Sequence, residues 1–291
     1  MEALRRRIEV RVMSLSGLAL GQIDYEHPEG DPGLFGPESM PWEVHSDFTS
    51  MLVGGIASLL LQMLHPLALA GVWDHSNFRQ DMLGRLRRTG QFVAGTSFAP
   101  TASADWLIDK VRSIHLKVTG TAADGRRYAA SDPALLTWVH VAEVSCFLAG
   151  YLRYLNPQLS GAEQDRYYAE IALVAERLGA TDVPKSRQAV ADYLDAMRPQ
   201  LVCDERTREI CRILLNAPAP SRSAVPISRL FMQAGIDLLP AWTQQQLGLQ
   251  QAAWQRPLIR AGVHSLAPIL RWAVRNGASH RSRKRMGLPP R

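Results

Sequence analysis

Two long apolar stretches decide the fold class of this chain: LVGGIASLLLQMLHPLALAGVW at residues 52–73 and LLTWVHVAEVSCFLAGYLRYL at residues 135–155. The first contains no Asp, Glu, Lys or Arg and is long enough to span a bilayer. It also contains His65 and Pro66, while the second carries His140 and Glu143, and such polar groups are costly in lipid. We therefore predict two central helices of a large helical core, the first bent or broken at Pro66.

Periodicity and capping residues predict helices in the rest of the chain as well. From Ala104 to Val118 apolar side chains recur at helical spacing, with Gly120 as the expected stop. Asp132 precedes a proline that suits the first position of a helix, and Ser160 with Glu163 has the spacing of a capping box. No strand-like alternation of useful length and no internal repeat is present, so the sequence predicts an all-α protein.

The expected order of elements follows from these signals. Helices are predicted over 1–20, 81–95, 160–178, 186–197, 205–215, up to 239 and over 258–274, with loops at 21–41, 97–103, 121–132 and 216–226. We predict one domain over residues 1–291, with a core at about 40–255 and a basic C-terminal tail at 275–291.

Composition limits the classes of function. With 46% hydrophobic residues the chain can bury a substantial core. The net charge of +6 is concentrated at the two ends, where a solvated tail or a peripheral membrane contact is expected. No nucleic-acid-binding motif is present, so no nucleic-acid partner is predicted. The three cysteines form no CxxC pair, which disfavours a disulfide framework and a cysteine-rich zinc site.

The N-terminal residues predict the compartment. Charged residues begin at Glu2, and no short apolar segment with a cleavage site follows them. We therefore expect a cytoplasmic protein, with membrane association through the basic ends as an alternative.

The sequence has no nucleophile elbow, P-loop, Rossmann glycine pattern or HExxH motif. These absences disfavour a hydrolase, a kinase and a nicotinamide-dependent enzyme.

His115 lies at the edge of an apolar helical stripe and permits two interpretations. It can be an ordinary core histidine with one hydrogen bond. Alternatively, its neutral imidazole can bind a haem iron while an acceptor holds the other ring nitrogen. Arg112 and Lys117 could then meet the haem propionates. The row containing Arg85 and Arg88 could do the same, line a distal pocket, or be a solvated helix face.

A second kind of metal site also stays open. His65, His75, His140 and Glu143 could form a mononuclear non-haem site between facing helices. Only one carboxylate lies inside the apolar runs, which argues against a di-iron site with four carboxylates. The alternative is a buried pair of helices joined by ordinary hydrogen bonds.

Three segments carry a family resemblance: LLLQMLHPLALAGVWDHSNFRQDMLGRLRRT at 59–89, KVRSIHLKV at 110–118 and YAASDPALLTWVH at 128–140. Together with later pieces they resemble the bacterial oxygenases related to latex clearing protein (rubber oxygenase) and to the fungal mycophenolic acid oxygenase. The resemblance covers about residues 40–255 and implies a helical fold with a globin-like core around haem b.

The resemblance also implies roles for single residues. The family's proximal histidine, preceded at i−3 by arginine, falls on His115 with Arg112. The family's distal Arg-x-x-Lys-Thr pattern falls on Arg85, Arg88 and Thr89, so arginine replaces the lysine. Guanidinium is a poor base, which disfavours rubber-type cleavage. Asp74 lies near the region of the family's catalytic glutamate and is a candidate for its role.

We therefore predict a haem b oxygenase that acts on a small hydrophobic substrate with dioxygen, and an electron donor is a candidate partner. His115 would hold the iron. Arg85, Arg88, Thr89 and Asp74 would serve the reaction, and Arg112, Lys117 and Arg85 would bind the cofactor. Two alternatives remain: a haem or hydrophobic-ligand carrier without catalysis, and the non-haem metal enzyme.

Overall fold

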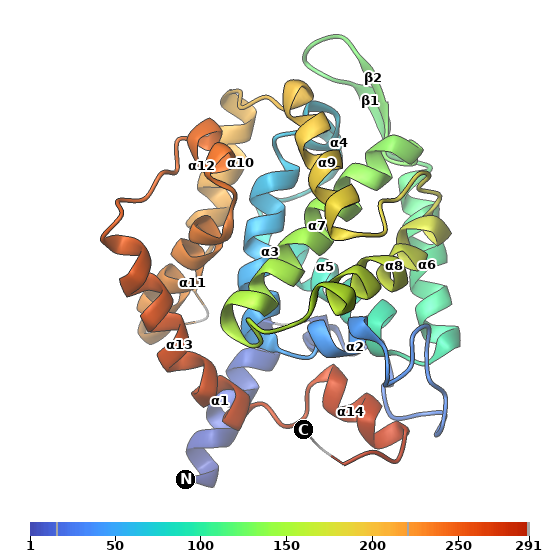
Figure 1. Ribbon diagram of the computed structural model, residues 1–291, viewed down its shortest axis with the longest axis vertical. Coiled ribbons are helices and arrows are strands. Elements are labelled where there is room, and N and C mark those ends of the chain that lie inside the picture. The colour runs from blue at the N-terminus through green and yellow to red at the C-terminus, as the bar shows by residue number, and fades with distance from the viewer. Residues whose placement is uncertain (16, 220, 290–291) are drawn as a thin grey trace.

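The computed structural model describes residues 1–15, 17–219 and 221–289, and it is built almost entirely of helices (Figure 1). The α-helices are α1 (Glu2–Leu15), α2 (Met40–Val44), α3 (Phe48–Gln62), α4 (Pro66–His75), α5 (Met82–Phe98), α6 (Thr101–His115), α7 (Pro133–Tyr154), α8 (Gly161–Leu178), α9 (Arg187–Met197), α10 (Glu205–Leu215), α11 (Val225–Leu238), α12 (Ala241–Leu247), α13 (Gln255–Ala273) and α14 (Ala278–Arg285). Short 3-10 turns lie at Gly17–Leu20, Arg198–Gln200 and Arg222–Ala224. The prediction of an all-α protein is confirmed.

The two apolar stretches form the centre of the fold, where α3 and α7 cross (Figure 1). The helices approach closely because glycines lie at the crossing. A Cβ atom added to Gly54 would lie 2.8 Å from the Cys146 carbonyl oxygen, and one added to Gly150 would lie 2.6 Å from that of Ser50. The predicted break at Pro66 is also confirmed, since α4 leaves α3 at an angle of 103°.

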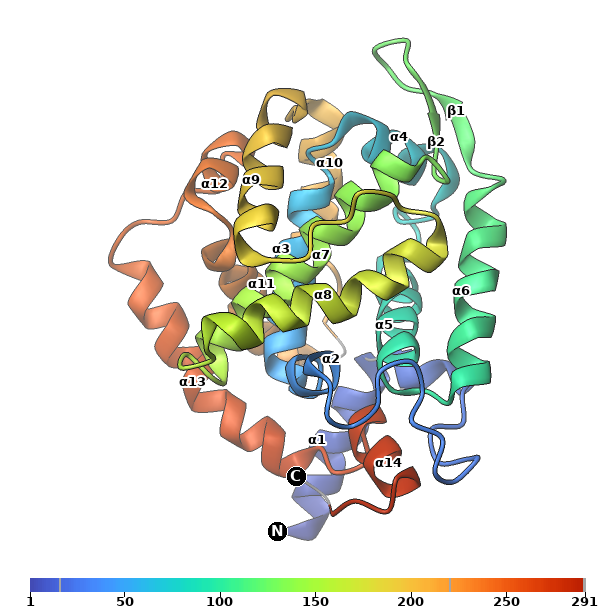
Figure 2. The same ribbon diagram turned by 45° about the vertical axis from the view of Figure 1, so that its right-hand side comes forward.

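Other helices surround this pair. α8 covers one side of α7, and α11 packs on α3 with α13 outside it. On the remaining side α5 and α6 lie side by side, as Figure 2 shows, and a β-hairpin projects beyond the end of α6. The capping predictions hold: Asp132 caps α7, and Ser160 with Glu163 forms a capping box at α8.

The hairpin corrects part of the sequence prediction. Residues 119–121 and 127–129 pair as antiparallel strands β1 and β2, where we expected the end of a helix and a loop. The helix ends at His115 because β-branched Val118, Thr119 and Thr121 suit extended structure. Gly125, with φ of +84°, makes the turn. The other helix boundaries differ by a few residues, and the short helices α2 and α12 were not predicted.

The basic C-terminal tail is also different from the prediction, since much of it is folded. It forms α14, and Arg285 is only 2% exposed. The Arg285 guanidinium donates hydrogen bonds to the carbonyl oxygens of Tyr25, Asp31 and Phe98 at 2.7–2.9 Å. The arginine therefore anchors the long loop before α2, and only part of the tail's charge is available to a partner.

By length and composition, α7 could cross a membrane. Helices α3 and α4 could do so only if the bent pair formed one span. Within α7, 72% of the apolar window is buried inside the protein. This burial agrees with the predicted role as a core helix.

Candidate functional site

His115, the last residue of α6, is half-buried, and its side chain forms no hydrogen bond with any residue that the structure describes. Its Nδ1 atom is buried without a partner. Burial lowers the pKa of the imidazole, so the ring is neutral at pH 7. A neutral imidazole with a free nitrogen is the form that binds iron. The acceptor that we expected for its second nitrogen is not found among the described residues.

Arg85 is the second polar group that lacks a counterpart. Its Nη1 donates to the Ser76 hydroxyl at 3.0 Å, but no acidic side chain in the described ranges pairs with it. Burial and the neighbouring Arg88 lower the Arg85 pKa to about 10. A desolvated guanidinium without a carboxylate is costly, which makes Arg85 a good partner for an anionic or oxygen-bearing ligand.

The other residues of the predicted distal row are placed differently. Arg88 is exposed and lies 3.5 Å from Asp81, the residue that caps α5. Thr89 is half-buried one residue further along the same helix. Asp74 is exposed, and its carboxylate accepts a 2.6 Å hydrogen bond from the Tyr128 hydroxyl of the hairpin. Asp74 therefore already has a partner that ties α4 to β2.

The predicted propionate partners lie at the surface. Arg112 is one turn before His115, Lys117 is two residues after it, and both are exposed. Neither side chain forms an ion pair with a residue that the structure describes. Both cations are thus available to a charged group at the surface beside His115.

Helix α7 contributes two further groups without partners. His140 is buried, its Nε2 has no hydrogen bond, and burial lowers its pKa to about 4. Glu143, one turn later and half-buried, has its pKa raised by burial to about 7. A carboxyl group whose pKa is raised in this way can hold a proton near neutral pH.

The residues proposed for a non-haem site do not come together. His65 caps α4, His75 lies 3.1 Å from the Thr119 carbonyl oxygen, and His140 lies within α7. Within residues 1–15, 17–219 and 221–289, no three His, Cys, Asp or Glu side chains could hold a metal ion. Haem differs in this respect, because the porphyrin supplies four ligands and the protein needs to supply only one.

A buried hydrogen-bond chain near His140 was missed by sequence reasoning. Ser97 donates to the Val93 carbonyl oxygen at 2.7 Å and so accepts from His45 Nδ1, also at 2.7 Å. His45 Nε2 is then the acceptor for the Tyr167 hydroxyl at 2.8 Å. Burial lowers the His45 pKa to about 3, with neighbouring His140 adding to the effect. The partners lie 52 and 122 residues from His45, so no local pattern could have indicated the chain.

One protein family matches the part of the chain that contains this site. Residues 42–272 match the model of the family described as "ER-bound oxygenase mpaB/B'/Rubber oxygenase, catalytic domain". The chain belongs to this family. Its members are oxygenases by that description, so the protein has an oxygenase catalytic domain that takes a substrate and dioxygen. The match includes His115, Arg85, Arg88 and His140.

Two further comparisons found nothing. No curated protein matches the chain, and no solved structure matches it. The predicted globin-like core of this rubber oxygenase relative therefore stays a prediction, as does its single-domain organisation. The identity of the cofactor must likewise be argued from the residues themselves.

Proposed function

We propose that the protein is a haem b-dependent oxygenase that acts on a small hydrophobic substrate, with His115 as the axial ligand of the iron. The observation that carries the proposal is the neutral imidazole of His115 at the end of α6, whose Nδ1 atom is buried without a hydrogen-bond partner among the described residues. Leaving such a nitrogen unpaired costs about 1–3 kcal/mol, and a metal ion would remove that cost. Membership in an oxygenase family supports the same reading.

The cations near His115 would match the negative charges of a haem group. Bound haem would supply the iron chemistry by which dioxygen reacts with the substrate. Arg112 and Lys117 would pair with its propionates at the surface, where both side chains are exposed. His115 would hold the iron without a carboxylate behind it, which makes the imidazole a weaker electron donor than one with such a partner.

Arg85, Arg88, Thr89 and Asp74 would act on the other side of the pocket. Arg85 would donate hydrogen bonds to an oxygen atom of the ligand or to a propionate, because it has only a hydroxyl as its present partner. Thr89 would add a second donor one turn along α5. Arg88 would reach the site by leaving Asp81, and Asp74 would act as an acid only after release from Tyr128.

An absorption spectrum of the purified protein, before and after reduction with dithionite, tests the cofactor. We expect a Soret band that shifts on reduction and that is lost in His115→Ala. His75→Ala is the matched control, since His75 is exposed and already bonded to the hairpin. Oxygen consumption with bound haem would then separate an oxygenase from a haem carrier.

A second candidate ligand has its own observation, which is the unpartnered Nε2 of His140. If His140→Ala loses the Soret band and His115→Ala keeps it, α7 and not α6 holds the iron. Bound iron without a Soret band, even after haem is supplied, would support a non-haem enzyme. Absence of both would leave a hydrophobic-ligand carrier.

A further inference from the structure

A surface cleft of about 510 Å³ opens beside the N-terminus of α5, and a drug-sized ligand would fit a cavity of this volume. One wall is the connection between α4 and α5, with Phe78, Arg79 and Met82. The other is the end of α10 and the loop after it, with Arg212 and Ile213. The cleft is therefore bounded by two segments that lie about 130 residues apart in the chain.

A second, much narrower cavity of about 10 Å³ lies deeper at the same place. Its lining is apolar except for Arg85, and Met82 belongs to both cavities. The apolar lining consists of Leu59, Met63, Met82, Ile210, Cys211 and Leu214. The two cavities meet at Met82, so movement of this side chain would join the surface cleft to the guanidinium that the proposed function places in the reaction site. Methionine side chains are flexible, so Met82 and Met63 can move aside for a ligand.

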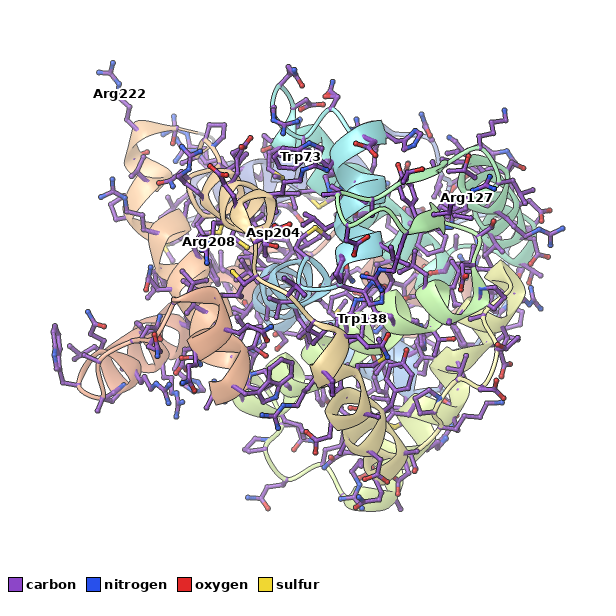
Figure 3. All side chains as sticks on the ribbon, turned by 90° about the horizontal axis from the view of Figure 1, so that it is seen from above. Trp73, Arg127, Trp138, Asp204, Arg208 and Arg222 are labelled. Carbon is purple, nitrogen blue, oxygen red and sulfur yellow. The ribbon has the colours of Figure 1, made fainter. Side chains whose placement is uncertain are left out.

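At the surface of the cleft, charged and aromatic side chains connect α10 to the end of α4 and the loop after it. Arg79 and Arg206 both stack on the Trp73 ring, at 3.9 and 5.0 Å from its centroid. Arg79 also pairs with Glu209 of α10 at 2.9 Å, and these side chains are partly exposed. Figure 3 shows Trp73 beside α10, near Asp204 and Arg208. Partly exposed contacts of this kind are weak, and α10 is held mainly by its buried side chains Ile210, Cys211 and Leu214.

Charge at the mouth indicates the class of ligand. Arg212 is exposed and forms no ion pair with any residue in the described ranges. Asp81, the acidic residue of the lining, is already used by Arg88 and by the backbone of α5. The mouth is therefore cationic while the inner passage is apolar.

We propose that this passage admits amphipathic ligands that have an unbranched apolar chain and one carboxylate. The chain lies past Met82 towards Arg85, and the carboxylate stays hydrated at the mouth beside Arg212. This inference deepens the proposed function, because it names the route and the class of substrate for the same site. Binding requires neither haem nor turnover, so the two proposals can fail separately.

Calorimetric titration with octanoate and with 1-octanol tests the ligand class. We expect Arg212→Gln to weaken octanoate binding about 3-fold, the size of an exposed charge contact, and to leave 1-octanol binding unchanged. Arg222→Gln is the matched control, because Arg222 is exposed and lies far from α10 in Figure 3. Equal effects of the two substitutions, or equal loss of both ligands, would overturn the assignment of the carboxylate to the mouth.

The passage itself is tested by changing the size of residue 82 in both directions. Met82→Trp should weaken both ligands roughly 10-fold, because the larger ring overfills the narrow cavity. Met82→Ala should leave binding intact or improve it, since it joins the two cavities. Circular dichroism checks that both variants fold. Unchanged binding in folded Met82→Trp would rule out this route.

A native cysteine reports where the ligand lies. Cys211 lines the narrow cavity, whereas Cys203 lines neither cavity. Alkylation by N-ethylmaleimide at mildly alkaline pH, quantified for each cysteine by mass spectrometry, should be slowed by octanoate at Cys211 and not at Cys203. Equal protection of both, or of neither, contradicts the proposal whether or not the protein binds haem.

Discussion

The two sides of the central α3–α7 pair are built in different ways. On the α11–α13 side the buried carboxylate of Asp237, which is 3% exposed, is surrounded by three arginines. On the α5–α6 side Arg85 has no carboxylate partner and the His115 imidazole has no hydrogen bond within the described structure. The first side therefore surrounds a buried charge with opposite charges, although Arg256 Nε there lacks a hydrogen bond, whereas the second side leaves a guanidinium and an imidazole for something that the protein binds.

This difference separates residues that hold the fold from residues that are available for chemistry. Buried polar groups are nearly always paired in folded proteins, so an unpaired group at a cavity suggests a ligand. We therefore expect substitutions on the α11–α13 side to change the free energy of unfolding. Substitutions on the α5–α6 side should change binding and leave stability nearly constant.

The largest effect is expected from Asp237→Asn. The carboxylate accepts hydrogen bonds from Arg153 at 2.9 Å and from Arg260 at 2.7 and 3.0 Å, while Arg256 lies 3.7 Å away. Loss of its charge leaves these guanidiniums facing one another, at a cost of roughly 3–5 kcal/mol in the free energy of unfolding. Urea denaturation measures the change.

Asp195→Asn is the control for that prediction. Asp195 also pairs with an arginine, Arg198, at 3.4 Å, but both side chains are largely exposed. Its loss should change stability by less than about 1 kcal/mol. Similar effects of the two substitutions would show that the buried cluster does not hold α7, α11 and α13 together.

Gly54 and Gly55 are adjacent in α3, but only Gly54 lies against the backbone of α7. A Cβ on Gly54 meets the backbone of α7 at 2.8 Å, so Gly54→Ala should destabilise the protein by about 1–3 kcal/mol. At Gly55 the nearest atom is a Phe147 ring carbon at 3.9 Å. Gly55→Ala should therefore stabilise the protein by about 0.5–1 kcal/mol through helix propensity. Thermal unfolding under identical conditions compares them.

The same sign for both alanines would argue against the α3–α7 crossing described above. Destabilisation by Gly55→Ala alone would place the close approach one residue away, on the other side of α3. Neither result would affect the proposed cofactor, since His115 lies on a different helix. The two glycine variants thus test the packing of α3 against α7 and do not involve the α5–α6 side.

Local signals in the sequence predicted much of this architecture. The apolar runs, Pro66 and the caps at Asp132 and Ser160 act within a few residues, so they fixed the central helices and their starts correctly. The hairpin after His115 was missed because its strands have only three residues each, too few for an alternating pattern. Arg285 was expected in solvent because its three carbonyl partners are distant in sequence.

The candidate site, like the fold, was predicted only in part. Residue types and the family resemblance predicted His115 and Arg85, and the structure adds that neither has an internal partner. The route past Met82 could not be predicted, because it depends on how α10 packs against α5. Nor could the chain through His45, whose partners come from helices far apart in the sequence. Tertiary packing decides both features, and a single sequence carries no direct record of it.

The smallest effect concerns Glu143, the unpaired counterpart of Asp237. Burial raises its folded-state pKa from 4.5 to about 7, so the folded protein holds a proton that the unfolded chain releases. Glu143 therefore adds stability below pH 4.5 that is lost as the pH rises through about 7. The expected loss is on the order of 1 kcal/mol, because the side chain is only half-buried and water relieves part of its charge.

Glu143→Gln should remove this pH dependence, and the difference in unfolding free energy between wild type and variant is the quantity to measure. His45, His65 and His140, whose pKa values are lowered to about 3–4, act in the opposite direction by adding stability as the pH rises towards 6.5. Their contribution is common to both proteins and cancels in the difference. A difference that stays constant with pH would mean that Glu143 is ionised when folded, so that burial does not keep this α7 carboxyl group protonated.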